Sequence, residues 1–373
     1  MNILCAFAQY DNTPSSYDDS SSPSIDNTPP PMDNTPPQYD NSSPPQMNNT
    51  PQMNNTSPQM NNTSPQMNNT SPQNYTSRFP VTQDGTCGNN TGNITYSCRP
   101  YDCCSFKGFC GGTTAHCGTG CQTDYGDCGI PNDGLKLIET CKFNKTLAFT
   151  FDDGPHEFTS QLLDILKEAD IKATFFVNGH NQAQYCIYDF ADILKRIFKE
   201  GHQICHHTWS HTHLGTESDE SIDFQIKHLN KAFERILGIF PKCFRNPFGE
   251  ATIHPRVRKN LLDAGYEEII LWDVDTRDWA TNNVTSIIEI FPSQINDTLH
   301  HIVLNHDRIN TTVTDFVPAA IKIAREFGYK FDTVYGCNGK RNKDDWYTYK
   351  GKPQERDNNT WHCDLKDIGD GQL

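Results

Sequence analysis

The chain has 373 residues, a mass of 42.2 kDa and 46 acidic against 31 basic side chains, which gives a formal charge of −15. Because a field of this sign repels phosphate groups, the composition argues against nucleic acid or anionic lipid as a partner. No apolar run approaches the roughly 20 residues that a membrane-spanning helix needs, so the sequence predicts no span of a bilayer.

The first 80 residues differ in composition from the rest of the chain. Residues 1–8 lack the basic start of a complete secretory signal, but Ala6-Phe7-Ala8 has the small-x-small pattern of a cleavage site, so we interpret them as a truncated signal peptide. Residues 9–80 hold 14 of the 23 prolines and repeat the unit QMNNTSP, so this tract cannot bury enough apolar surface to order its backbone. Its Asn-x-Thr sequons suggest the glycosylated stalk of a secreted protein, and repeat expansion without a role beyond spacing is an equal alternative.

Eight of the 15 cysteines fall between residues 87 and 128, where glycines are frequent and aliphatic side chains are few. A segment this poor in core-forming residues needs covalent cross-links or a metal to fold. A zinc ribbon would show paired CxxC spacings, which this segment lacks, so the pattern favours four disulfides formed in an oxidising compartment. Spacing alone leaves their pairing open.

The cysteine spacing resembles that of the hevein-type chitin-binding module, which we assign to residues 81–130. The resemblance implies the disulfides Cys87–Cys104, Cys98–Cys110, Cys103–Cys117 and Cys121–Cys128. It also implies a shelf where a hydroxyl and aromatic rings hold N-acetylglucosamine, at Ser105, Lys107, Phe109 and His116. The family usually has aromatic rings where Lys107 and His116 stand, so we expect stacking on a sugar to be weaker or rearranged, with Phe106 as a substitute ring.

From Cys141 onward, short apolar runs alternate with amphipathic stretches. The predicted strands are Leu147–Phe151, Ala173–Val177, His202–Cys205, Lys242–Arg245, Glu268–Val274, His301–Asn305 and Lys330–Val334. The predicted helices are Gln161–Lys167, Ala191–Lys199, Ser221–Leu237, Pro255–Ala264, Ser286–Ile290 and Phe316–Glu326. Seven strands separated by six helices predict a parallel β/α architecture, either a barrel or a doubly wound sheet.

Polar and titratable residues follow five of the predicted strands. These segments are Asp152-Asp153, His206–His211, Arg245–Pro247, Asp275–Trp279 and His306-Asp307. In a barrel the carboxyl ends of the strands share one face, where active sites are built from loops. The common position predicts that the five segments form one site.

The candidate metal ligands are His207 and His211, which are four residues apart and would present both imidazoles on one side of a helical turn. Asp153 would complete a two-histidine, one-carboxylate set that leaves a coordination position for water. Neighbouring side chains of a strand point in opposite directions, so Asp152 would act as the base on that water. The alternatives are that these histidines are only buried and hydrogen-bonded or belong to a His-rich surface, and that Asp-Asp-Gly-Pro is only a turn.

Three further side chains fit the same chemistry. His306 has a near-neutral pKa that suits a general acid, and Asp278 is a candidate to orient it. Arg245, beside a carboxylate, would keep Asp152 ionised. Trp279 is equally well a core residue or a pocket wall.

Five ordered motifs resemble those of the NodB-like polysaccharide deacetylases. They are TFDDGP at 150–155, HTWSH at 207–211, RNPFG at 245–249, DTRDW at 275–279 and LNH at 304–306. The resemblance covers residues 141–337. It implies a distorted (β/α) barrel that removes acetyl groups from polysaccharides with a divalent metal, zinc or cobalt.

The resemblance also implies a role for each matching residue. Asp152 would be the base, with Asp153, His207 and His211 as metal ligands, Arg245 tuning Asp152, and Asp278 orienting the acid His306. The Phe248 backbone N–H and the metal would stabilise the oxyanion, and Trp279 and Leu304 would enclose the acetate methyl. Asn246 and Phe248 replace the usual proline and tyrosine, and Arg277 adds a positive charge near the site. Cys141 and Cys337 would form a disulfide, whereas the sequence leaves open how Cys186, Cys205, Cys243 and Cys363 pair.

The sequence therefore predicts a secreted, monomeric chitin deacetylase, held at chitin or a cell wall by its module, with a C-terminal tail at residues 338–373. The module favours chitin over acetylxylan or peptidoglycan, because the catalytic motifs do not distinguish these polysaccharides. The alternative from another class is a non-catalytic chitin-binding wall protein. The intact set of acidic and histidine residues argues against it.

Overall fold

The computed structural model describes residues 79–88, 95–181, 185–281, 283–296 and 299–363. The interpreted signal peptide (1–8) and the repeat tract (9–80), except for its last two residues, lie outside the described part of the chain. None of the described helices is both long and apolar enough to cross a membrane.

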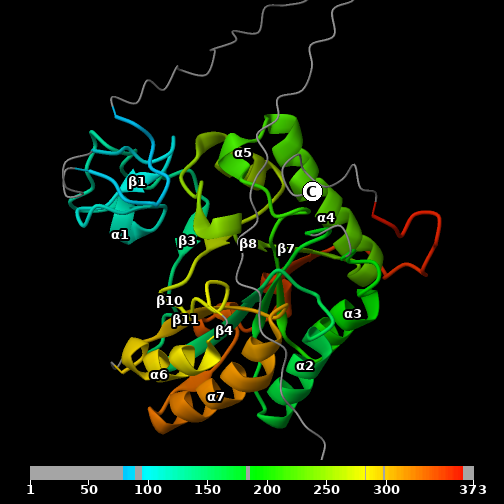
Figure 1. The fold of residues 1–373 in the computed structure, drawn as a ribbon. Helices are drawn as coiled ribbons and strands as arrows, with labels where there is room; N and C mark the ends of the chain where they lie inside the picture. Colours follow the sequence, from blue (N-terminus) through cyan, green and yellow to red (C-terminus); the bar gives the residue numbers. More distant parts are fainter. Residues whose placement is uncertain (1–78, 89–94, 182–184, 282, 297–298, 364–373) are drawn as a thin grey trace, which may run out of the picture. The chain divides into compact units, whose positions relative to one another are not determined.

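Nine parallel strands of the described residues form one sheet, of which Figure 1 labels several strands. The strands are β3 (Lys136–Ile138), β4 (Thr146–Asp152), β5 (Thr174–Val177), β6 (Gln203–His206), β8 (Cys243–Phe244), β9 (Glu268–Ile270), β10 (Val274–Asp275), β11 (His301–His306) and β12 (Lys330–Phe331). Their order is β10-β11-β4-β5-β6-β8-β9-β3, and β12 pairs with the start of β4. The predicted parallel β/α architecture is confirmed.

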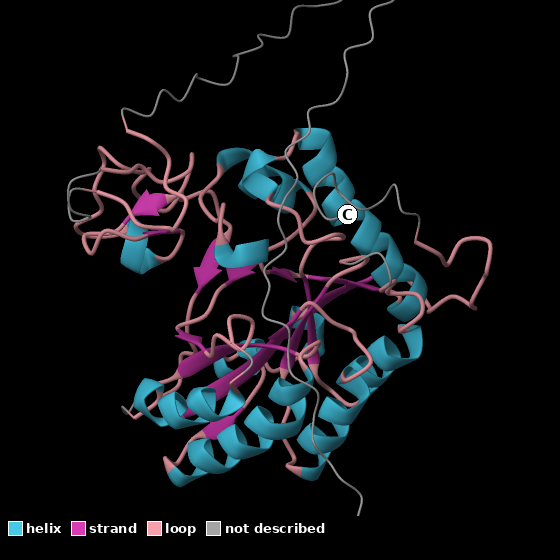
Figure 2. Ribbon diagram, in the orientation of Figure 1, coloured by secondary structure: helices cyan, strands magenta, loops and turns pink. Residues whose placement is uncertain are grey.

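Helices cover the outer face of this sheet, as Figure 2 shows. They are α2 (Thr159–Glu168), α3 (Ala191–Lys199), α4 (Asp219–Leu237), α5 (Pro255–Asp263), α6 (Val284–Gln294) and α7 (Val317–Glu326), with the short α8 (Val334–Cys337) near the end of the barrel. The longest of them, α4, begins where the Ser218 side chain accepts a hydrogen bond from Ser221 N and ends at Gly238 with φ of 72°. Its buried face, spaced by three and four residues, packs on the sheet.

The sheet curls into a distorted barrel. The covalent backbone, rather than a hydrogen-bonded pairing of the two strands, joins β9 to β10. The expected single strand Glu268–Val274 is wrong, because the structure divides it into β9, which pairs with β8, and β10, which pairs with β11. These two strands lie toward opposite ends of the hydrogen-bonded order, and residues 271–273 link them. The carbonyl oxygens of Ile270 and Leu271 instead accept hydrogen bonds from the Arg245 side chain, at 3.0 and 2.9 Å.

The C-terminal segment packs on the barrel, so position 337 does not end the folded domain. Strand β13 (Tyr347–Tyr349) pairs antiparallel with β7 (Ile239–Pro241), and neither strand is among those predicted. Trp346 and Trp361 are buried, and a disulfide joins Cys186 to Cys363.

The described residues 79–88 and 95–130, here called the cysteine-rich segment, are held together by disulfides around two very short strands and one helix. These elements are β1 (Cys103–Cys104), β2 (Cys110–Gly111) and α1 (Thr114–Cys117). The four disulfides are Cys87–Cys104, Cys98–Cys110, Cys103–Cys117 and Cys121–Cys128, the pairs that the resemblance implies. The implied pair Cys141–Cys337 is also present, and the remaining cysteines that the structure describes pair as Cys186–Cys363 and Cys205–Cys243.

The link between this segment and the barrel is fixed by Arg258, a fully buried residue of α5. Its guanidinium donates to both carboxylate oxygens of Asp133, at 2.7 and 2.6 Å, and to the carbonyl oxygens of Leu135 and Thr252. A planar fork that satisfies several acceptors at once stabilises the irregular backbone before β3.

We expect Arg258→Met to destabilise the protein by about 2–4 kcal/mol, because it leaves the carbonyl oxygens of the buried residues Leu135 and Thr252 without their side-chain donor and removes the ion pair with Asp133. Arg256→Met, two residues earlier on the same helix, is the matched control, since Arg256 makes only an exposed ion pair with Asp219 at 3.6 Å. Urea unfolding of the two variants measures the difference. Equal unfolding midpoints would contradict a structural role for Arg258.

Candidate active site

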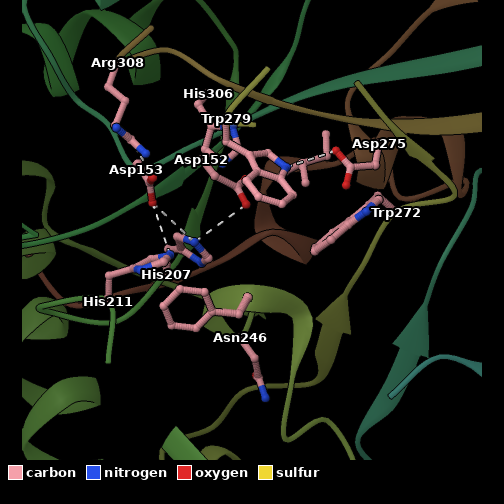
Figure 3. A pocket seen from close by; sticks show the side chains of 12 residues that line it. Asp152, Asp153, His207, His211, Asn246, Trp272, Asp275, Trp279, His306 and Arg308 are labelled. Atoms are coloured by element: carbon pink, nitrogen blue, oxygen red, sulfur yellow. Dashed lines mark hydrogen bonds and ion pairs between the residues drawn. The ribbon is translucent and has the colours of Figure 1, made fainter. Parts of the chain in front are cut away.

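A pocket of about 310 Å³ opens at the carboxyl ends of the parallel strands. Its walls come from the strand-end segments that the sequence groups together, so the expectation of one shared face agrees with the geometry. Figure 3 shows the acidic and histidine side chains converging on it. The lining residues are Asp152, Asp153, His207, His211, Asn246, Phe248, Trp272, Asp275, Trp279, Leu304, His306 and Arg308.

Asp152 ends β4 and is held by Arg245 from behind the pocket. Arg245 Nη1 donates to Asp152 Oδ1 at 2.7 Å and to Thr150 Oγ1 at 2.8 Å. The other carboxylate oxygen, Oδ2, lies 3.6 Å from His207 Nε2. Burial raises the pKa of Asp152 to about 6, although the charge of Arg245 opposes the rise. Asp152 is therefore ionised at neutral pH yet close enough to its pKa to accept a proton.

Asp153, His207 and His211 bring three ligand atoms together. Asp153 Oδ1 lies 3.3 Å from His211 Nε2 and 3.7 Å from His207 Nε2, and the three atoms lie within 4.8 Å of one another. Asp153 Oδ1 is buried and has no hydrogen-bond partner among the described residues. Burial lowers the pKa of each histidine to about 4, so both rings are neutral at pH 7. A carboxylate oxygen facing two neutral nitrogens fits a divalent cation.

The tautomer of His207 also fits a metal ligand. Its Nδ1 lies 2.8 Å from the Arg245 carbonyl oxygen, which can only accept a hydrogen bond. Nδ1 therefore carries the proton, and the lone pair of Nε2 faces the pocket.

The loop that carries both histidines is not the expected helical turn. Thr208 and His211 have φ of 71° and 57°, in the left-handed region. The buried Trp209 anchors the loop, because its backbone N–H donates to Gln225 O and its carbonyl oxygen accepts from the N–H of Gly179 and His180. The backbone, rather than the spacing of four, directs both rings to one point.

The expected opposite directions of Asp152 and Asp153 are also not found. Asp153 lies just beyond β4 with φ of 75°, which breaks the alternation of the strand. Both carboxylates consequently face the pocket. Arg308 Nε donates to Asp153 Oδ2 at 2.8 Å and leaves Oδ1 for the two imidazoles.

His306 ends β11 across the pocket and is oriented by Asp278. The Asp278 carboxylate accepts hydrogen bonds from His306 Nδ1 at 2.7 Å, from its backbone N–H at 2.8 Å and from Thr312 Oγ1 at 2.9 Å. Burial lowers the pKa of His306, but the hydrogen bond and charge of Asp278, with the other carboxylates, outweigh it and raise the pKa to about 9. His306 is therefore protonated at neutral pH.

Three residues contribute apolar side chains to the pocket wall. Leu304 is buried at the pocket floor, whereas Trp279 and Phe248 are exposed at its rim, each with about half of its surface accessible (53% and 52%). Phe248 adopts φ of 60°, and its ring packs against the rings of His211 and His213. Trp279 is thus a wall residue rather than a core residue.

Several lining residues were not singled out from the sequence. Arg308 follows His306-Asp307 directly, so the strand-end pattern itself contained the signal. Trp272 lies inside the single expected strand Glu268–Val274, and its pattern does not set this residue apart. Asp275 begins the DTRDW motif and accepts hydrogen bonds from Arg277 N and Trp279 Nε1.

Other residues from the sequence motifs lie outside the pocket lining. Arg277 is exposed, with its guanidinium 5.9 Å from the Trp279 ring. Asp307 is buried and accepts a hydrogen bond from Thr159 Oγ1, and it lies so close to Gly154 that a Cβ there would meet its carboxylate at 2.2 Å. His206 is buried against the Ile226 carbonyl oxygen, so the alternative of a purely structural histidine holds for this residue.

The four shelf positions differ in their burial and in their contacts. Ser105 is buried, and its hydroxyl exchanges hydrogen bonds with the backbone of Phe109, whose ring is exposed. The ammonium of Lys107 lies 5.7 Å from the exposed ring of Phe106. His116 is half-buried, and its Nδ1 lies 2.6 Å from Thr113 Oγ1.

Comparison with known proteins places this barrel among characterised relatives. Residues 140–269 match the family model described as polysaccharide deacetylase. The chain is 35% identical over 221 residues to a chitin deacetylase of Colletotrichum lindemuthianum, which covers 57% of this chain and 87% of the relative. It is 34% identical to the peptidoglycan-N-acetylglucosamine deacetylase PgdA of Listeria monocytogenes, over 55% of this chain but only 41% of that protein.

The solved structure of the Colletotrichum enzyme superimposes on 57% of this chain and 95% of its own, with a TM-score of 0.53 and 33% identity. The chain belongs to the polysaccharide deacetylase family and is a hydrolase of that class.

Proposed function

We propose that this protein is a secreted, metal-dependent chitin deacetylase that hydrolyses N-acetyl groups of chitin and its oligomers to glucosamine units and acetate. The observation that carries the proposal is the pairing, in one pocket, of an ionised Asp152 with a protonated His306 beside the Asp153–His207–His211 cluster. Amide hydrolysis needs one group that takes a proton and another that gives one.

Each pocket residue has its own role in the proposed reaction. Asp152 Oδ2 accepts a proton from the water that attacks the carbonyl carbon, while Arg245 holds the opposite oxygen. The Phe248 N–H donates to the oxygen that becomes negative, and Leu304 with Trp279 encloses the acetyl methyl. The C–N bond then breaks as His306 Nε2 gives its proton to the departing amine, with Asp278 holding Nδ1.

Asp153, His207 and His211 would hold the metal, with zinc as our first choice and cobalt as the alternative. Two imidazole nitrogens and one carboxylate oxygen are ligands that zinc accepts in catalytic sites, where one position is left for water or substrate. When bound, such an ion lowers the pKa of water to about 7 and polarises a carbonyl group.

The polysaccharide is assigned through the cysteine-rich segment. We propose that it is a hevein-like module that binds chitin through Ser105, Phe109 and the exposed ring of Phe106, with Lys107 and His116 in place of the usual rings. A tether to insoluble chitin raises the local concentration of acetyl groups at the pocket. The tether favours chitin over acetylxylan and peptidoglycan, which remain the alternatives within the family.

The number of disulfides supports our proposal that the protein is secreted. The described residues contain seven disulfides, which persist in oxidising compartments. Association with a cell wall would follow from chitin binding. We propose that the protein acts as a monomer, because the pocket is built by one chain.

We expect Asp152→Asn to reduce acetate release from N-acetylglucosamine oligomers by about 10²–10⁴-fold, because an amide cannot accept the proton. Chitin pull-down should be unchanged, since the cysteine-rich segment is untouched. His306→Asn should give a similar loss and guards against a folding defect caused by leaving Arg245 unpaired. Acetylated xylan is the parallel substrate: if only xylan released acetate, the chitin assignment would fall, and unchanged turnover of oligomers by both variants would sink the mechanism.

Metal binding is tested without reference to activity. Loss of a residue that only orients a metal ligand weakens metal binding by about 10–100-fold. We expect His211→Ala, which removes a ligand itself, to weaken zinc binding by more than this. His213→Ala, two residues along the same loop and paired with Glu250, should keep wild-type zinc binding. Zinc titration monitored by thermal unfolding measures both variants. Equal zinc stabilisation of His211→Ala and the wild-type protein would rule out the assigned ligand set.

The pH profile should be bell-shaped. Asp152 works unprotonated, so activity falls as pH drops through its pKa of about 6, and His306 works protonated, so activity falls as pH rises through about 9. A bound divalent cation lowers both pKa values, so in the metal-loaded enzyme both limbs lie at lower pH than these two values. Asp278→Asn removes the charge that raises the His306 pKa and should move the alkaline limb down by about one unit or more. The exposed Asp315 supplies the control, Asp315→Asn, and an alkaline limb that stays in place in Asp278→Asn would exclude His306 as the acid.

A further inference from the structure

A second cavity, here called the groove, continues the catalytic pocket toward the cysteine-rich segment. It has a volume of about 490 Å³, and three of its lining residues, Phe248, Trp272 and Asp275, also line the catalytic pocket. In Figure 3 Trp272 and Asp275 lie together, on the side of the pocket away from Arg308. Its other walls are Cys110, Gly111, Gly112, Thr113, Ala115, His116 and Glu139 on one side and Gly249, Leu271 and Asp273 on the other.

The wall from the cysteine-rich segment is fixed by specific contacts with the barrel. Thr252 Oγ1 donates to the Gly112 carbonyl oxygen at 2.8 Å, and Thr114 N donates to Glu139 Oε1 at 2.6 Å. Ile253 packs among the disulfide sulfurs of this segment. Polar and apolar contacts together hold the groove open as a defined shape.

Both walls present a ring packed closely on glycine. A Cβ on Gly249, whose φ is 68°, would lie 2.8 Å from the Trp272 ring, and a Cβ on Gly111 would lie 2.8 Å from the His116 ring. The missing side chains let the two rings approach the backbone this closely. Ring faces such as that of Trp272 suit the faces of pyranose rings.

The charge of the groove selects among polysaccharides. Its titratable lining residues are Glu139, Asp273, Asp275 and His116, and it contains no lysine or arginine. Burial lowers the pKa of His116, so this ring adds no positive charge at neutral pH. A neutral acetylated chain, or one with ammonium groups after deacetylation, meets no like charge there, whereas peptidoglycan, which carries carboxylates, would be repelled.

We propose that the groove binds sugar units of the same chitin chain that follow the unit in the catalytic pocket, so that the cysteine-rich segment forms part of the substrate cleft. The inference rests on the proposed function and extends it to chain length. Since the groove is larger than the catalytic pocket, it takes at least one further unit. Binding energy from these remote units is available to the reaction at the acetyl group.

The test fills the groove with a side chain. Ala115 is exposed and lines the groove, so Ala115→Arg places a guanidinium within reach of its carboxylates. Thr119→Arg adds the same charge to an exposed position of the same segment that does not line the groove. Trp272→Ala, which removes the opposite wall, is the second groove variant. For each full-length protein, kcat/KM is measured on the disaccharide and the hexasaccharide of N-acetylglucosamine.

We expect the ratio of kcat/KM for the hexasaccharide to that for the disaccharide to fall by about tenfold in Ala115→Arg, which corresponds to about 1.4 kcal/mol of lost binding. Trp272→Ala should lower the ratio as well, and Thr119→Arg should keep the wild-type ratio. Wild-type ratios in both groove variants would overturn the groove as a sugar site while leaving the deacetylase intact. If the wild-type protein released no acetate from either oligomer, both the proposed function and the assignment of a chitin chain to the groove would be overturned.

Discussion

The buried guanidinium of Arg245 is the interaction on which the rest of the barrel's active face depends. It lies directly after β8 and donates to Asp152, to Thr150 and to two carbonyl oxygens where β9 ends and the link to β10 begins. Its own carbonyl oxygen fixes the tautomer of His207. Phe176 covers the guanidinium at 3.7 Å, so the charge is removed from water. Because desolvating arginine is costly, loss of these acceptors would destabilise the barrel. The same contacts hold the base and one histidine at fixed positions.

Strained backbone gathers around the same site. Asp153, Thr208, His211 and Phe248 all have positive φ although none is glycine. Each such residue costs about 1–3 kcal/mol, which the surrounding structure must offset. Buried anchors such as Trp209 do so, and the result is that ligand atoms and a backbone N–H face one point. An ordinary helix or strand would have presented the same side chains to different sides.

The sequence predicted the elements and the common face well because both depend on local patterns. Helix α3 has the predicted bounds, Ala191–Lys199, since its apolar spacing and the following glycine define it. The division of 268–274 into two strands was not predictable, because Leu271 and Trp272 continue the apolar run, and only the closure of the barrel separates the two strands. Left-handed residues at Asp153 and His211 were equally hidden, since tertiary contacts impose them. Trp272 and Arg308 were missed for a related reason: their importance lies in which cavity they face, and spacing does not show it.

One loop connects the chemistry of the barrel to the cysteine-rich segment. Phe248 stands at its start, and within six residues Glu250 pairs with Arg99 at 2.7 Å, Thr252 bonds to Gly112 and Ile253 packs among the disulfides. A displacement of the cysteine-rich segment would therefore move the backbone next to the reacting carbonyl group. Flexible tethers leave catalysis and anchoring independent, whereas a segment docked on this loop couples them. The docking contacts thus give this small segment two roles. It forms one wall of the proposed sugar cleft, and it stabilises the loop that carries the Phe248 N–H.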